Sequence, residues 1–254
     1  GAGGAIGTAN VARASADARR VLLASTSALT ISPNLREVKY DPLTDFEPIL
    51  SAAVGPVAML ASRNAPFDHL QGMLEFAKEH PQAVRYGTPG VGSVAHLAME
   101  GLQMQADVSL THVPYRGESP AIQDALGGVV ELLVVNTPTI LQHVEAGSLR
   151  PLAVLEPQRL EAWPDVPTLT EAGYQNLEYS SDFGIFVHAT MPEDAQAAIG
   201  KLFKQAVNSG QFQQTISNMS LLPGSAEGAD YGRKIADELQ RNAEIIKSRQ
   251  IKVE

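Results

Sequence analysis

Short apolar runs alternate with helical patterns along most of this chain, and this alternation limits its fold more than any other feature. Helix-length or turn-rich segments separate six runs with the composition of buried strands: RVLLAS, PVAMLAS, AVRYG, VELLVVN, RPLAVL and FGIFVHA. Parallel sheets covered by helices on both faces use strands that are almost continuously apolar. The pattern therefore predicts an α/β fold with mostly parallel sheets.

Two helical regions and one loop add detail to this prediction. Apolar residues recur at helical spacing across residues 67–80, and Asp68 is the expected N-cap of that helix. Residues 197–251 are charged and carry a helical apolar stripe, so we expect a C-terminal helical layer. In the proline-rich segment WPDVPTLTEAGY, Thr168 and Glu171 have the spacing of a capping box.

The composition excludes several classes of partner. The 254 residues carry a formal net charge of -9 and no run of Lys or Arg, so the chain lacks the basic surface that nucleic acid or anionic lipid requires. No stretch approaches the ~18 consecutive apolar residues of a membrane-spanning helix, so we expect no direct membrane insertion. There is no cysteine, which excludes disulfides and thiolate chemistry.

A strand-to-helix turn of one type recurs along the chain. It is clearest in VRYGTPGVGSVAHLAME, where an apolar run stops, small residues follow, and Ser93 is the expected cap of the next helix. VPYRGESPAIQDALGG and VVNTPTILQHVEAG repeat the device with Ser119 and Thr137 as expected caps, and VLLASTSALT is a weaker fourth case. Each such turn presents unpaired N–H groups and the positive end of a helix dipole, which together attract an anion.

Turns of this kind meet at the carboxyl edge of an open α/β sheet, so we expect them to form one ligand cleft. Side-chain donors favour this interpretation at Thr88, Ser93, Asn136 and Thr137, although such turns can also simply connect strands to helices. A nucleotide site is not supported, because the turn lacks the Walker lysine and the chain lacks a G-x-G-x-x-G motif followed by an acidic residue. The predicted ligand is a carboxylate, bound without metal or cofactor.

No catalytic or metal-binding constellation is recognisable. The six histidines are scattered, and His96 and Glu100, one helical turn apart, are expected to be a solvent-facing pair at a capped helix start. There is no G-x-S-x-G motif around a nucleophilic serine. Asp41 and Asp45 could form a carboxylate pair, but the neighbouring prolines favour a turn that leads into the next strand. We therefore expect no catalytic residues, no metal and no enzymatic activity.

Two other residues each have two interpretations. Trp163 either lines the cleft or covers an edge of the core. Asp182 is either a cap or an acidic group that points into the cleft, where it would favour a ligand with an amino or hydroxyl group. The sequence leaves both choices open.

Six segments, taken in order, resemble the Bug-type, TctC-like solute-binding proteins of tripartite tricarboxylate transporters: GAGGAIGTANVARA, DPLTDFEPI, YGTPGVGSVAHLAME, HVPYRGESPAIQDALGGVVELLVV, AGSLRPLAV and DVPTLTEAGY. The resemblance spans nearly the whole chain. It implies a two-domain fold of the periplasmic-binding-protein type II, each domain a mostly parallel sheet flanked by helices, with a small carboxylate bound in the cleft between them. It also implies a periplasmic protein with a signal peptide in its precursor and a membrane transporter or sensor as partner.

The resemblance implies domains at residues 1–62 plus 182–254 and at residues 63–181. It also implies cleft-forming loops, and the matching residues of this chain are Ser25, Thr26, Ser27, Ala28, Thr88, Gly90, Val91, Gly92, Ser93, Tyr115, Arg116, Gly117, Asn136, Thr137 and Asp182. Relatives carry a first strand ahead of the GAGG motif, and this sequence starts at Gly1 within that motif. We therefore expect the first domain to lack that strand, which would weaken ligand binding.

Two other classes of protein remain as alternatives. An effector-binding domain of a transcription regulator can share this fold, but it would need a DNA-binding segment that this sequence does not contain. An enzyme would need a catalytic group that the motifs do not reveal. The identity of the ligand stays open among dicarboxylates, tricarboxylates, acidic amino acids and aromatic acids.

Overall fold

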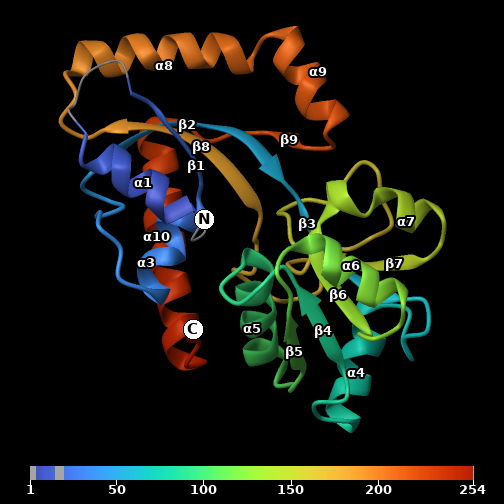
Figure 1. The fold of residues 1–254 in the computed structure, drawn as a ribbon. Coiled ribbons are helices and arrows are strands. Elements are labelled where there is room, and N and C mark those ends of the chain that lie inside the picture. Colours follow the sequence, from blue (N-terminus) through green and yellow to red (C-terminus); the bar gives the residue numbers. More distant parts are fainter. Residues whose placement is uncertain (1–3, 15–19, 254) are drawn as a thin grey trace. The chain divides into compact units, whose positions relative to one another are not determined.

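The structure is a computed structural model that describes residues 4–14 and 20–253. The described chain divides into two compact units (Figure 1). Unit 1 comprises Gly1–Gly55 and Ser181–Glu254, and unit 2 comprises Pro56–Ser180. The chain therefore crosses between the units twice, once directly before Pro56 and once directly before Ser181.

Unit 1 is built on an antiparallel sheet. Its described strands lie in the order β1 (Leu22–Ser25), β8 (Ser181–His188), β2 (Phe46–Gly55) and β9 (Leu222–Pro223). Every neighbouring pair in this order is antiparallel. The prediction of a mostly parallel sheet is therefore wrong for this unit. The apolar runs report burial of both faces, and helices on both faces bury an antiparallel sheet equally well.

Helices cover both faces of the unit 1 sheet. Phe186 of β8 packs with Tyr231 on one face, whereas its neighbour Ile185 packs with Phe203 on the other. In Figure 1 the strands accordingly lie between the two long helices of this unit. The predicted helical character of the C-terminal region is confirmed by three helices: α8 (Glu193–Val207), α9 (Gly210–Asn218) and α10 (Gly228–Ser248). The prediction of a single layer is wrong, because α8 and α10 cover opposite faces of the sheet.

The first part of unit 1 contains three short helices: α1 (Ala5–Ala12), α2 (Ser27–Thr30) and α3 (Ser32–Leu35). The expected turn before β2 is confirmed, because Asp41 Oδ1 accepts the N–H groups of Leu43 and Thr44 at 2.8 and 3.1 Å. The expectation about the start of the chain concerns Gly1, which lies outside the described residues.

Unit 2 contains a mixed sheet. Its described strands lie in the order β5 (Thr111–Pro114), β4 (Arg85–Thr88), β6 (Leu132–Asn136), β3 (Val57–Ser62) and β7 (Leu149–Val154). β4 is parallel to both β5 and β6, whereas β3 is antiparallel to both β6 and β7. Among these strands β3 alone runs against the others, so the unit 2 sheet is close to the predicted parallel arrangement.

β3 also bears on the expected domain limits. The family resemblance implied that residues 57–62 belong to the first domain, but both strands that pair with β3 belong to unit 2. The pairing moves the limit to Gly55, because a strand belongs with the sheet that satisfies its backbone groups. The assignment of two functional domains stays a prediction.

The helices of unit 2 are α4 (Leu70–Glu79), α5 (Val94–Ala106), α6 (Glu118–Leu126), the 3₁₀ helix η2 (Thr137–Thr139) and α7 (Leu141–Glu145). Helix α4 is capped by His69, whose Nδ1 accepts the N–H of Gly72 at 3.0 Å, so Asp68 was the wrong cap. Helix α6 begins earlier than predicted, because Gly117 with φ 110° makes the turn and Ser119 falls inside the first helical turn.

The predicted capping box of the proline-rich segment is confirmed. Thr168 Oγ1 accepts the N–H of Glu171 at 3.0 Å, and a Glu171 carboxylate oxygen accepts the N–H of Thr168 at 2.9 Å. These reciprocal bonds are those of a capping box. Trp163 packs against the apolar cluster that includes Ala121 and Leu133, so it covers an edge of the unit 2 core.

Candidate functional site

Three of the four predicted turns meet at one edge of the unit 2 sheet. They are residues 88–93, 115–117 and 136–137, and they follow the parallel strands β4, β5 and β6. The N–H of Tyr115 donates to the Thr88 carbonyl at 3.0 Å, and the N–H of Gly117 donates to the Pro89 carbonyl at 3.0 Å. The first two turns are therefore joined by their main chains.

The third turn is tied to the start of α6. The main-chain N–H and the Nδ2 of Asn136 both donate to Oε1 of Glu118, at 3.0 and 2.7 Å. The N–H of Thr137 donates to the Pro56 carbonyl at 2.8 Å, and the side chain of Thr137 is buried. Asn136, not Thr137, occupies the cap position of η2, so the predicted cap was one residue late. Thr137 therefore stabilises the main chain at this edge of the unit 2 sheet.

Residues 88–93 form a glycine-dependent turn that opens onto the start of α5. Gly90 and Gly92 have φ values of 148° and 75°, which other residues rarely adopt. A Cβ at Gly90 would also lie 3.1 Å from the Tyr115 carbonyl oxygen. Ser93 caps α5 as predicted, because its Oγ accepts the N–H of His96 at 3.2 Å.

The start of α5 offers donors without internal partners. In the described part of the chain, no intramolecular hydrogen bond is present for the N–H groups of Val91, Val94 and Ala95. The first turn of α5 contains no acidic residue, and the Arg116 side chain on the adjoining turn is exposed. The positive end of a 13-residue helix, the free N–H groups and an exposed arginine on the adjoining turn together favour an anion at this turn.

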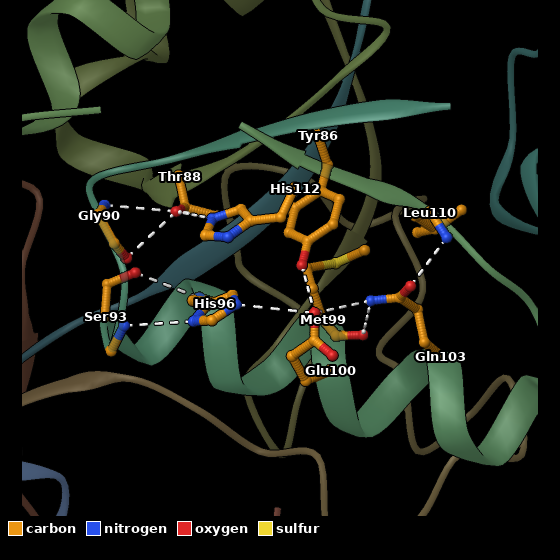
Figure 2. Close-up of polar contacts among 11 residues, drawn as sticks. Tyr86, Thr88, Gly90, Ser93, His96, Met99, Glu100, Gln103, Leu110 and His112 are labelled. Atoms are coloured by element: carbon orange, nitrogen blue, oxygen red, sulfur yellow. Dashed lines mark hydrogen bonds and ion pairs between the residues drawn. The ribbon is translucent and has the colours of Figure 1, made fainter. Parts of the chain in front are cut away.

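A buried polar cluster lies directly beneath this turn, and the sequence reasoning missed it (Figure 2). His96 and Glu100 are 5% and 7% exposed, so the predicted solvent-facing pair is wrong. The reason is that α5 is buried along residues 95–103, leaving that face no access to solvent. His112 of β5 stacks on His96 with ring centroids 3.9 Å apart and planes at 11°. The sequence feature that could have indicated this buried cluster is His112, a histidine inside the strand segment THVP.

The hydrogen bonds of this cluster connect it to the turn. His96 Nδ1 accepts the N–H of Gly92 at 3.2 Å, and His112 Nε2 lies 2.7 Å from Thr88 Oγ1. Burial, reinforced by the adjacent His96 and opposed by Glu100, lowers the pKa of His112 to about 3. His112 is therefore neutral over the ordinary physiological pH range.

The carboxylate of Glu100 organises the other side of the cluster. Its Oε1 accepts the Tyr86 hydroxyl at 2.6 Å and Nε2 of Gln103 at 3.0 Å. His96 Nε2 lies 3.6 Å from the same oxygen. Among the described residues, no group of three or more His, Asp or Glu side chains is arranged to hold a metal ion.

The fourth predicted turn, residues 25–28, lies in unit 1. The hydroxyls of Ser25 and Ser27 are 2.9 Å apart, whereas Thr26 and Ala28 are buried. The N–H of Thr26 donates to the Asp182 carbonyl at 2.8 Å, which brings together the two predicted site regions of this unit.

The side chain of Asp182 is fully engaged inside unit 1. Its Oδ1 accepts the hydroxyls of Ser51 and Tyr231 at 2.7 and 3.1 Å, and its Oδ2 lies 2.6 Å from Lys234 Nζ. The residue is 1% exposed. These contacts are not those of a helix cap, and they link β8 with β2 and α10.

Residues 1–251 match the tripartite tricarboxylate transporter family receptor, TctC. The chain is 30% identical to Protein BugT of Bordetella pertussis over 252 residues, which cover 97% of this chain and 76% of BugT. In the described part of the chain, no helix has the length and apolar character needed to cross a membrane.

Two solved structures show the same fold. A TctC solute-binding protein from Polaromonas, determined without ligand, has a TM-score of 0.86 and 27% identity over 98% of this chain and 84% of its own. An R. palustris protein determined with adipate has a TM-score of 0.82 and 27% identity over 99% of this chain and 85% of its own. Because the family match spans residues 1–251, the chain belongs to the tripartite tricarboxylate transporter receptor family of solute-binding proteins.

Proposed function

We propose that this protein captures a small carboxylate in the periplasm and delivers it to the membrane subunits of a tripartite transporter. Family membership supports the general role of a solute-binding receptor. The structure of a relative with adipate, a dicarboxylate, supports the class of ligand. The observation that carries the proposal for this chain is the donor-rich turn at residues 88–93.

The turn suits a carboxylate for three reasons. The free N–H groups of Val91 in the turn and of Val94 and Ala95 at the start of α5 can donate to carboxylate oxygens without breaking an internal bond of the described chain. The dipole of α5 stabilises negative charge at this point. Arg116 adds an exposed guanidinium, which pairs well with planar carboxylates.

The other predicted residues fall into two groups. We propose that Gly90, Gly92 and Gly117 shape the ligand contacts of the turn in unit 2, and that the Ser25 and Ser27 hydroxyls are ligand contacts in unit 1. Buried or internally bonded side chains support the sites from behind, and these are Thr26, Ala28, Thr88, Tyr115, Asn136, Thr137 and Asp182.

Isothermal titration calorimetry of the purified protein tests the proposal. The panel contains C4 to C6 dicarboxylates, tricarboxylates, acidic amino acids, aromatic acids and ATP, in a buffer free of carboxylates. We expect at least one carboxylate to bind without added metal and ATP not to bind. Binding of ATP with no heat from any carboxylate would contradict the proposal.

Ser93→Ala separates ligand binding from helix stability. It should lower the free energy of unfolding by ~1 kcal/mol through loss of the cap, and it should also weaken carboxylate binding because the N–H groups at the helix start lose their order. Ser209→Ala is the matched control, since Ser209 caps α9 by accepting the N–H of Phe212 at 3.2 Å. The control should lower stability similarly and leave carboxylate affinity unchanged. If Ser93→Ala, like Ser209→Ala, bound carboxylate with wild-type affinity, residues 88–93 would not be part of the ligand site.

A further inference from the structure

The floor of the turn at residues 88–93 is a stack of three rings from three elements (Figure 2). His96 of α5 lies against His112 of β5, with centroids 3.9 Å apart. Tyr86 of β4 stacks with His112 at 4.8 Å and 20°. Aromatic stacking of this kind restricts the position and the rotation of both imidazoles.

Each imidazole holds one end of the turn. His96 Nδ1 accepts the N–H of Gly92 at 3.2 Å, next to the start of α5. His112 Nε2 lies 2.7 Å from Thr88 Oγ1, and the same oxygen accepts the N–H of Gly90 at 3.3 Å. The two rings thus connect to both glycines that give the turn its shape.

These contacts require His96 in one protonation state. Because Nδ1 accepts a hydrogen bond, the ring proton must sit on Nε2, which lies 3.6 Å from Glu100 Oε1. A proton on Nδ1 would place two donors, the ring and the N–H of Gly92, against each other. The titratable groups that face the two rings in the described chain are Glu100 of α5 and Tyr86 of β4.

We propose that His96 and His112 are positioning residues that, as neutral rings, hold the turn so that its free N–H groups face a bound carboxylate. This inference rests on the proposed function of the turn. Glu100 assists by orienting Nε2 of His96, which leaves Nδ1 available to Gly92. The histidines themselves touch no ligand in this arrangement, since His96 is buried beneath the turn.

Paired substitutions test the proposal with adipate as the calorimetric probe. His96→Leu removes the acceptor at Nδ1, whereas His96→Asn retains an oxygen near that position. His112→Leu and His112→Gln form the equivalent pair for Nε2. We expect each Leu variant to bind adipate about tenfold more weakly, as loss of one buried hydrogen bond implies, and each amide variant to stay within about threefold of the wild type.

His80→Leu is the control, because His80 is exposed at the end of α4 and should not affect adipate affinity. Melting temperatures are measured in parallel, so that a purely structural role, which would lower stability alone, is distinguished from positioning. Wild-type affinity in a folded His96→Leu or His112→Leu variant would overturn the proposal.

A second measurement does not depend on ligand binding or on the folding of any variant. Long-range ¹⁵N–¹H correlation spectra of the wild-type protein show which ring nitrogen of His96 carries the proton. We expect Nε2, and a proton on Nδ1 would overturn the proposal. If neither adipate nor the rest of the panel bound the wild type, the proposed function would fail, while the spectra would still decide how His96 holds Gly92.

Discussion

Replacing His112 with glutamine is expected to make the folded protein less sensitive to acid. His112 lies between Tyr86 and His96, and its Nε2 is 2.7 Å from Thr88 Oγ1. A protonated ring at this place would be poorly solvated and would face a second imidazole at 3.9 Å. His112→Gln keeps a polar atom near Nε2 but cannot titrate.

The direction of the effect follows from the direction of the pKa shift. Burial, with a further contribution from His96, lowers the pKa of His112 from 6.5 to about 3. Between these two values the unfolded chain binds a proton at His112 and the folded protein does not. The stabilisation is therefore fully present above pH 6.5 and is lost progressively as the pH falls toward 3. Since one pKa unit corresponds to 1.36 kcal/mol, the loss between pH 7 and pH 5 is about 2 kcal/mol.

Urea unfolding at pH 7 and pH 5, in buffers without carboxylates, measures this difference. The wild type should lose about 2 kcal/mol more than His112→Gln over this interval, because the other titrating groups are common to both proteins. His80→Gln, which removes an exposed histidine, should behave as the wild type. Equal pH dependence in the wild type and His112→Gln would refute the reasoning, as would NMR titration of the His112 ring near pH 6.5.

Three other substitutions have expected outcomes in unfolding experiments. Gly184→Ala should destabilise the protein by ~2 kcal/mol or more, because the added methyl group would overlap the Tyr231 hydroxyl on α10; a neutral result would mean that Tyr231 moves freely. Asp182→Asn should lower stability by about 2 kcal/mol, since it removes the buried charge that pairs with Lys234, and an unchanged urea midpoint would contradict that role. Thr168→Ala should lower it by about 1 kcal/mol through loss of the capping box, and no change would show that the box is dispensable.

Local features of the fold could be read from the sequence. The Ser93 cap of α5, the capping box of Thr168 and Glu171, and the turn at Asp41 all appear as predicted. Each depends on hydrogen bonds between residues no more than four positions apart, so the residue types and their spacing are sufficient. The glycine-containing turn at residues 88–93 and the capped helix start that follows it belong to the same class, because their residue types and spacing define them.

Family membership could also be predicted from the sequence, through motifs spread along the chain in a fixed order. The cap of α6 shows the limit of local rules. Ser119 and Pro120 form a good helix start, but Gly117, held by its N–H bond to the Pro89 carbonyl, starts the helix earlier. A tertiary contact therefore overrode the local preference.

Strand direction and the environment of polar side chains were decided by tertiary structure. Apolar runs report that both faces of a strand are buried, but pairing partners determine whether the sheet is antiparallel, as it is in unit 1. Asp182 is engaged by Ser51, which lies 131 positions away, and by Lys234, 52 positions away. His96 and His112 come together only because β5 is parallel to β4 and α5 packs beneath the turn. Contacts between such distant segments leave no periodic signal in the sequence. The burial of these polar side chains therefore could not be predicted from the sequence and is determined by the tertiary structure.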